Sequence, residues 1–410
     1  MTPDKILKAA LSALLVAAVA WLGTNRQFYA EAMASAFFAF ALANVIVIHL
    51  RLLPTWKDAS VTLAAALVLW AVDIHGLHFK PAILMMLSFA GLSSLAVFGV
   101  RTIWADRADR KLLLLGFVPA LLFVVSEFFA DNMLRWTAEH HPFYLDLYLF
   151  SFDSSLGKEI PFVVGQAFHR WQWLRLVSVF FYLGLPIPIA VIYSGRLRRL
   201  REKAVPAAVA FLITGPVGMI FYNLFPAAGP VHVFRGGFPM HLFPMDQIAK
   251  LTPGPIPVNG PPNAMPSLHM AWVLLVWWYS RGLSWWERSI ALLFLVFTLL
   301  ATLGTGEHYF IDLIVAFPFA LMIESVCAYT LKATDRQRVL GFCVGLAGTL
   351  GWFSLLRNGF HFFWLTPAIP WTFCAATFIV SLFSERLLQQ ADGAVTVRVP
   401  DRTPALSPAS

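Results

Sequence analysis

The chain has 410 residues, of which 59% are hydrophobic and only 13% are charged, and its mean hydropathy is +0.71. A soluble domain needs a charged fraction of roughly 25%, so this composition excludes a soluble globular protein. The net charge of +8 fits basic loops on the cytoplasmic side of a membrane better than a nucleic-acid-binding surface, and we expect no nucleic acid partner.

Apolar stretches of membrane-spanning length recur along the chain and predict an all-α polytopic membrane protein. We expect about twelve transmembrane helices, near residues 6–22, 31–50, 60–77, 82–100, 112–130, 172–193, 204–225, 267–280, 288–304, 309–330, 339–356 and 367–386. The first resembles a signal peptide in its basic start, at Lys5 and Lys8, but no extended polar region follows it. We therefore expect the first helix to be retained.

Two long segments interrupt this pattern, at residues 131–171 and 226–266. The first mixes aromatic and charged residues, as short helices lying along the membrane interface do, and the second is a loop rich in proline and glycine. Lysine and arginine concentrate in alternate loops, above all in GRLRRLREK, which predicts cytoplasmic termini. Both long segments then face the exterior, as in a protein of the bacterial inner membrane.

The sequence NAMPSLHMAW, residues 263–272, begins the eighth expected helix. Pro266 followed by Ser267 is a typical helix start, with the serine as the capping residue. The free backbone N–H groups and the helix dipole make such an end attractive to anions. His269 is therefore predicted to lie beside a phosphate site.

The sequence GTGEHYFIDLIVA begins the tenth expected helix. His308 and Asp312 are four residues apart, a spacing that places both on one helix face. A carboxylate that holds one imidazole nitrogen leaves the other as a nucleophile or base. Because an unpaired charge in an apolar helix is costly, we expect Asp312 to pair with His308.

Other polar groups have structural interpretations. A single interfacial histidine more often makes a structural hydrogen bond, and we interpret six histidines in this way: His140, His141, His169, His232, His241 and His361. No tight metal-ligand spacing is present, so we expect neither a metal nor another cofactor. The three cysteines lie in apolar segments and show no pairing pattern.

The two histidine motifs together, P-S-x-H and then H-Y-x-x-D one helical hairpin later, resemble the type 2 phosphatidic acid phosphatase (PAP2) superfamily. Leu268 replaces the usual glycine of P-S-G-H, and in this the sequence is similar to the branch of inositol phosphorylceramide synthases and sphingomyelin synthases. The resemblance covers residues 111–330, which implies a six-helix PAP2-like core. It leaves a four-helix N-terminal region at 1–104, a two-helix region at 331–390 and a tail at 391–410 that we expect to be disordered.

The resemblance implies metal-independent phosphoryl transfer through a phosphohistidine. His308 would be the nucleophile, Asp312 would orient it, and His269 would protonate the leaving oxygen and then activate the acceptor. Reasoning from the residues allows the same chemistry, because it places a carboxylate-held imidazole near a second imidazole at a helix N-terminus.

The sequence departs from the family pattern at the groups that bind phosphate. Thr302 occupies the position of an expected arginine, and the K-x6-R-P motif is absent from the loop NLFPAAGPVHVFRGGFP. Phosphoryl oxygens still need cationic or N–H donors. Our candidates are Arg235, Lys158 and Arg135, together with donors at Ser267 and Gly306.

Two enzyme activities and one remote alternative remain open. The first is transfer of a phosphoryl or phospho-head group from a lipid-linked phosphate ester at the outer leaflet to a lipid or glycan hydroxyl, which the motifs favour slightly. The second is a lipid phosphatase that uses water, with phosphatidate or a polyprenyl phosphate as substrate. The expected helix count also fits a transporter, but the sequence has no obvious repeat. The sequence indicates neither the lipid nor the oligomeric state.

Overall fold

The fold is described from a computed structural model that places residues 2–25, 36–52, 55–74 and 82–398. Within these ranges the chain is helical, and its one β feature is an isolated antiparallel bridge between Tyr144 and Ile256. The all-α class is therefore confirmed for the described chain.

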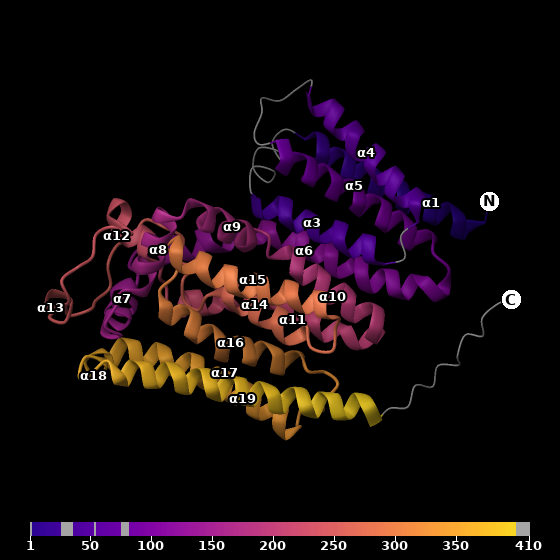
Figure 1. Ribbon diagram of the computed structural model, residues 1–410. Helices are drawn as coiled ribbons and strands as arrows, with labels where there is room; N and C mark the ends of the chain where they lie inside the picture. Colours follow the sequence, from indigo (N-terminus) through magenta and orange to yellow (C-terminus); the bar gives the residue numbers. More distant parts are fainter. Residues whose placement is uncertain (1, 26–35, 53–54, 75–81, 399–410) are drawn as a thin grey trace.

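Four N-terminal helices form one side of the molecule (Figure 1). They are α1 (Pro3–Thr24), α3 (Ala36–Arg51), α4 (Trp56–Ile74) and α5 (Ala82–Trp104). The helix α5 packs against the other three, and α3 also packs against α6 and α10 of the central layer. The N-terminal region is joined to the rest of the protein through α3 and through the packing of α5 against α6.

The central layer consists of seven α-helices of the described chain (Figure 1). They are α6 (Arg107–His140), α9 (Gln172–Leu183), α10 (Pro186–Leu200), α11 (Val205–Leu224), α14 (Leu268–Tyr279), α15 (Trp285–Gly304) and α16 (Phe310–Cys327), with the short 3-10 helix η1 (Arg201–Ala204) between α10 and α11. The helix α14 contacts α11, α15 and α16. Nine of the twelve residues of α14 are buried, and the helix is almost entirely apolar. The helix α14 therefore lies at the centre of the layer.

The C-terminal helices cover the other side of the central layer, against α16 (Figure 1). They are α17 (Arg336–Asn358), α18 (Phe360–Phe363) and α19 (Ala368–Arg398). Close approach of α17 to α16 depends on Gly345, where a Cβ would lie 2.6 Å from the backbone nitrogen of Met322.

The two long segments between spans contain short helices gathered at one end of the central layer (Figure 1). They are α7 (Asp146–Ser155), α8 (Ile160–Arg170), α12 (Pro230–Phe234), the 3-10 helix η2 (Arg235–Gly237) and α13 (Met245–Ile248). The Tyr144–Ile256 bridge links the two segments, with backbone hydrogen bonds of 2.7 and 2.9 Å. This end also holds the first turns of α14 and α16, where both histidine motifs lie.

Within the described residues, each of the twelve stretches that we expected to cross the membrane contains helix, while residues 31–35 and 75–77 of the second and third stretches lie outside the described residues. In the described residues, eight helical stretches are long and apolar enough to do so, and three further apolar helices are shorter. The chain is therefore an integral membrane protein, while the number of spans stays a prediction. The expected helix 172–193 is divided into α9 and α10, with Gly184 and Leu185 between them. The helix α19 continues through residues 391–398, which we had placed in the tail.

Candidate active site

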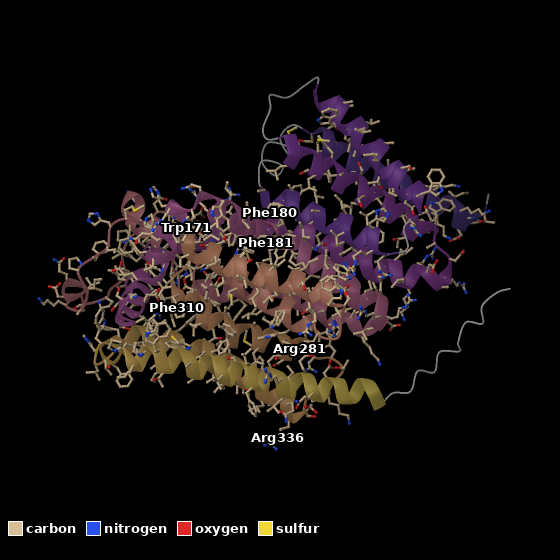
Figure 2. The ribbon with its side chains drawn as sticks, viewed as in Figure 1. Trp171, Phe180, Phe181, Arg281, Phe310 and Arg336 are labelled. Carbon is tan, nitrogen blue, oxygen red and sulfur yellow. The ribbon has the colours of Figure 1, made fainter. Side chains whose placement is uncertain are left out.

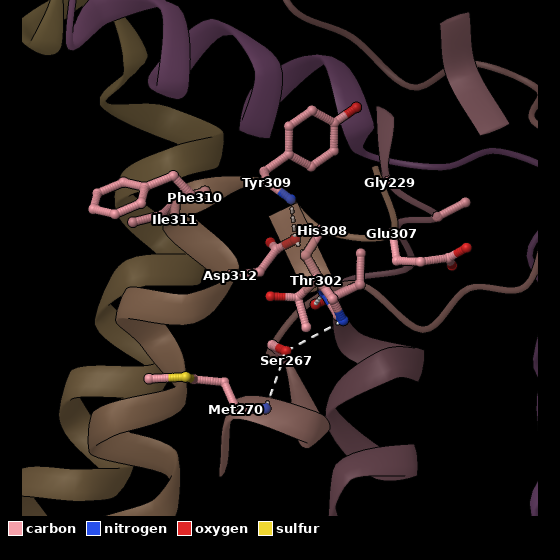
Figure 3. Close-up of polar contacts among 12 residues, drawn as sticks. Gly229, Ser267, Met270, Thr302, Glu307, His308, Tyr309, Phe310, Ile311 and Asp312 are labelled. Atoms are coloured by element: carbon pink, nitrogen blue, oxygen red, sulfur yellow. Dashed lines mark hydrogen bonds and ion pairs between the residues drawn. The ribbon is translucent and has the colours of Figure 1, made fainter. Parts of the chain in front are cut away.

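Ser267 fixes the start of α14. Its hydroxyl accepts a hydrogen bond from the Met270 backbone N–H at 3.4 Å, as an N-cap residue does (Figure 3). Its own backbone N–H donates to the Asp312 carbonyl oxygen at 3.2 Å. The first turns of α14 and α16 are thereby held together.

His308 lies in the tight connection between α15 and α16. Gly306 has a φ of +78°, which suits glycine, and the His308 backbone N–H returns to the Thr302 carbonyl oxygen at 3.2 Å. The His308 Nδ1 atom lies 2.9 Å from the carbonyl oxygen of Ala264, and Nε2 lies 3.2 Å from the Ser267 hydroxyl (Figure 3). A carbonyl oxygen only accepts hydrogen bonds, so Nδ1 carries the proton and the lone pair is on Nε2.

Burial keeps His308 in its neutral, nucleophilic form. The side chain is 3% exposed, and burial lowers the pKa of His308 to about 4, against smaller raising effects from Glu307 and the Ala264 carbonyl. At neutral pH the imidazole therefore has a free lone pair on Nε2, which faces the Ser267 hydroxyl.

Asp312 is completely buried next to His308. Its Oδ2 atom lies 3.4 Å from His308 Nδ1 and accepts the Tyr309 backbone N–H at 2.8 Å. The closest acceptor to Nδ1 is thus the Ala264 carbonyl, which our sequence analysis did not single out. Asp312 is positioned to stabilise positive charge on the ring as well as to orient it.

His269 is the second residue of α14, and aromatic rings enclose its side chain. Its ring stacks on Tyr182 of α9, with centroids 3.9 Å apart, and contacts the edge of Trp272 at 6.0 Å. Phe37 of α3 approaches it at 5.8 Å. The two imidazoles are close enough to interact electrostatically. Within the described residues the ring nitrogens of His269 have no hydrogen-bond partner, which leaves them available for a substrate.

Two buried aspartates of α7 hold the backbone around His308, and sequence reasoning missed both. The Asp153 carboxylate accepts the backbone N–H groups of Phe310 at 2.6 Å and Ile311 at 3.1 Å, the first two residues of α16. Asp146 accepts those of Ala228 at 3.1 Å and Gly229 at 2.8 Å. Burial raises the pKa of Asp146 to about 6 and raises that of Asp153 well above its usual value, and the N–H donors oppose both shifts.

The loop before α12 packs directly on the loop that carries His308. The Val231 N–H donates to the Gly306 carbonyl oxygen at 2.9 Å, and the Ala264 N–H donates to the Ala227 carbonyl oxygen at 2.8 Å. At Gly229, with a φ of +93°, a Cβ atom would lie 2.3 Å from the Glu307 carbonyl oxygen. Only glycine fits this contact.

The comparison with known families turns on the region that contains these groups. Residues 147–326 match the family model of the PAP2 superfamily. No curated protein and no solved structure matches the chain. The PAP2 match runs from α7 to the end of α16 and includes both histidine motifs. It indicates a membrane enzyme of the phosphatase or phosphotransferase type.

The PAP2 region brings some predicted site residues together and leaves others apart. Ser267, His308 and Asp312 are in contact, and Gly306 shapes the turn before His308. The three candidate cations all have exposed side chains. Arg235 follows α12, Lys158 lies between α7 and α8, and Arg135 donates to Asn132 on α6 at 2.8 Å. Among the described residues, none of these cations makes a hydrogen bond to the histidine motifs.

Next to His308 the structure places an acidic side chain, whereas the three candidate cations make no hydrogen bond to the histidine motifs in the described residues. Glu307 lies beside His308, and its carboxylate is 3.6 Å from His232 Nε2. Within the described residues, no three histidine, cysteine or carboxylate side chains converge in a way that could hold a metal ion. The role of the three cations in phosphate binding stays a prediction.

Proposed function

We propose that this protein is a membrane phosphotransferase that acts on a lipid-linked phosphate ester through a phosphohistidine at His308. The observation that carries the proposal is the pair of contacts made by the His308 ring, to Ala264 through Nδ1 and to Ser267 through Nε2, inside the PAP2-matched region. These contacts define one tautomer and one reactive nitrogen.

In the first step the Nε2 lone pair attacks phosphorus, and the bond from phosphorus to the leaving lipid oxygen breaks. His269, protonated when the anionic phosphate binds beside it, gives its proton to that oxygen. The Ser267 hydroxyl exchanges its contact with Nε2 for one with a phosphoryl oxygen, beside the positive end of the α14 dipole. Positive charge develops on the His308 ring, where the Asp312 carboxylate at 3.4 Å stabilises it.

In the second step neutral His269 takes a proton from an acceptor hydroxyl. The acceptor oxygen attacks phosphorus, the bond from Nε2 to phosphorus breaks, and its electron pair returns to His308. The ring nitrogens of His269 lie beside Tyr182 and Trp272, which would hold the imidazole in place for both transfers.

For the acceptor, we favour a lipid or glycan hydroxyl over water. His308 is 2% exposed and Ser267 is 0% exposed, a burial that limits the access of bulk water to the phosphorylated ring. Leu268, the motif residue that suggested a transferase, packs against Gly218 of α11, where a Cβ would lie 2.3 Å from its Cδ2. Its contribution is therefore to helix packing, and the support for transfer comes from the motif and from burial. Hydrolysis of phosphatidate or a polyprenyl phosphate is the alternative outcome.

The contact between Ser267 and His308 also has the form of a serine nucleophile with its general base. Chemical stability separates the two intermediates, because a phosphohistidine is lost in acid and survives base, whereas a phosphoserine behaves in the opposite way. Protein trapped with a lipid phosphate labelled on phosphorus is therefore split between acid and base treatment. Label that survives acid and is lost in base would assign the nucleophile to Ser267.

The activity itself is tested on the purified protein with a panel of phospholipids and polyprenyl phosphates, with and without lipid hydroxyl acceptors. Mass spectrometry distinguishes a transferred head group from free phosphate. We expect His308→Ala to lose all turnover and remain folded, and Asp312→Asn to be strongly impaired. His140→Ala is the matched control, because among the described residues the ring of that exposed histidine hydrogen-bonds within α6 alone, to the Trp136 carbonyl oxygen. Full activity of the His308→Ala variant would contradict the proposed mechanism.

A further inference from the structure

A basic pocket lies at the end of the helix bundle opposite His308. It has a volume of about 560 Å³ and is formed by Trp277 of α14, Arg281 and Gly282 of the next loop, Arg288 of α15, and Arg386, Gln389 and Gln390 of α19. The 16 residues of α15 between Arg288 and Gly304 span roughly 24 Å. A ligand head group in this pocket therefore cannot reach the histidine motifs.

The pocket remains basic although one of its arginines forms an ion pair. Arg281, labelled in Figure 2, pairs with the fully buried Glu385 of α19. Arg288 lies over the ring of Trp277, 5.6 Å from its centroid, and both Arg288 and Arg386 are exposed. Of the three lining arginines, Arg281 pairs with Glu385, and the lining Gln389 donates to the buried Glu324. Arg288 and Arg386 are the two exposed arginines that face the solvent-accessible space.

Apolar side chains continue from the pocket along both helices. On α15, Leu292 and Val296 follow Arg288 at intervals of four residues, and both are exposed. On α19, Phe383 and Ile379 precede Arg386 by three and seven residues, and both are 62% exposed. Each arginine thus ends an apolar stripe on a helix of membrane-spanning length.

We propose that this pocket binds the phosphate-bearing head group of an anionic phospholipid from the membrane leaflet at this end of the bundle. The arginines would contact the phosphate and the two stripes would contact the acyl chains. Basic pockets between the ends of transmembrane helices bind anionic lipid head groups in this way. The site combines α14 and α15, which lie inside the matched residues 147–326, with α19, which lies outside them.

The test compares the binding of phosphatidylglycerol and phosphatidylcholine with the same acyl chains to the purified full-length protein, by native mass spectrometry. We expect the wild-type protein to retain the anionic lipid in preference to the zwitterionic one. A basic residue near a membrane surface contributes about fivefold to lipid affinity, so the double variant Arg288→Gln/Arg386→Gln should bind phosphatidylglycerol about 30-fold more weakly.

The matched control is Lys332→Gln/Arg336→Gln. It removes the same charge from two exposed residues that do not line the pocket. Lys332 lies between α16 and α17, and Arg336, labelled in Figure 2, is the first residue of α17. Binding at the His308 end is common to all variants and cancels in the comparison. Equal loss in the control, unchanged binding in the pocket variant, or no preference between the two lipids would each overturn the proposal. Displacement of the lipid by millimolar inorganic phosphate would instead assign the pocket to a soluble anion and also overturn it.

Discussion

Replacing Asp153 by alanine tests whether α7 positions the nucleophile. The change removes the acceptor of the Phe310 and Ile311 backbone N–H groups at 2.6 and 3.1 Å, inside a fully buried environment. Each buried donor left without a partner costs roughly 1–3 kcal/mol, so we expect a loss of about 2–6 kcal/mol in the free energy of unfolding. For a chain of this length the midpoint of thermal unfolding should fall by about 2–7 °C.

The assay is thermal unfolding of the detergent-purified protein, followed by tryptophan fluorescence, together with steady-state kinetics on the lipid substrate. Because His308 and Tyr309 directly precede α16, a shift of about 1 Å at its first turn should reduce kcat by roughly 100-fold. Asp153→Asn keeps one acceptor and should lie between wild type and alanine in both readouts.

Ser154→Ala is the matched control for this prediction. Ser154 is the next residue of α7 and equally buried, but its hydroxyl has no hydrogen-bond partner in the described residues. Its removal should leave stability and kcat near wild type. If Asp153→Ala were no more damaging than Ser154→Ala, the carboxylate would not hold the first turn of α16, and the positioning argument would be refuted.

Two further predictions follow from the same site. Burial lowers the pKa of His308 to about 4. We therefore expect kcat/KM for a phosphodiester substrate to show no loss from His308 protonation between pH 7 and 5. A decrease in kcat/KM centred near pH 6.5 would show that the ring is not buried as described. The same lowering means that protonation favours the unfolded chain, so the stabilising contribution of neutral His308 is lost as the pH falls from about 6.5 to 4. Gly229→Ala should displace the His308 loop and reduce both activity and melting temperature. The control is Gly236→Ala in the same segment, which should have little effect because no atom lies within 4 Å of an added Cβ. Equal melting curves for the two variants would exclude the tight contact between Gly229 and Glu307.

The sequence predicts the helices and the histidine motifs well, because both have short-range signals. Apolar runs determine the helices, and the spacing of His308 and Asp312 places them on one turn. The Ala264 carbonyl could not be predicted, since a backbone acceptor has no side-chain signature and reaches His308 only through the folded loop. Asp146 and Asp153 did carry a signal, because two acids seven residues apart in a short helix rich in aromatic and aliphatic residues need hydrogen-bond donors once they are buried.

The three candidate cations could not be placed from the sequence. We predict a role for Arg235, Lys158 and Arg135 because they are charged and lie on the expected outer side, but charge alone does not tell where a side chain points. Their side chains are exposed, while the groups that surround His308 are carbonyls, hydroxyls and carboxylates. The phosphate binding that we propose therefore has to draw on the hydroxyl of Ser267, the end of α14 and the charge that develops on His308, or on movement of the segments 131–171 and 226–266 towards the substrate.

The helices outside the PAP2-matched region contact the site through packing and single hydrogen bonds, and such contacts leave no sequence motif. Trp364 donates from its indole N–H to the Ser151 hydroxyl at 3.0 Å, and Trp371 donates to the Leu156 carbonyl oxygen at 3.1 Å, so the C-terminal helices brace α7 and with it Asp153. On the other side Phe37 of α3 completes the aromatic enclosure of His269. Packing and single indole hydrogen bonds need no sequence pattern beyond an aromatic residue at the right depth. A core cut at residues 147–326 would keep both histidines and lose the contacts that hold them in place.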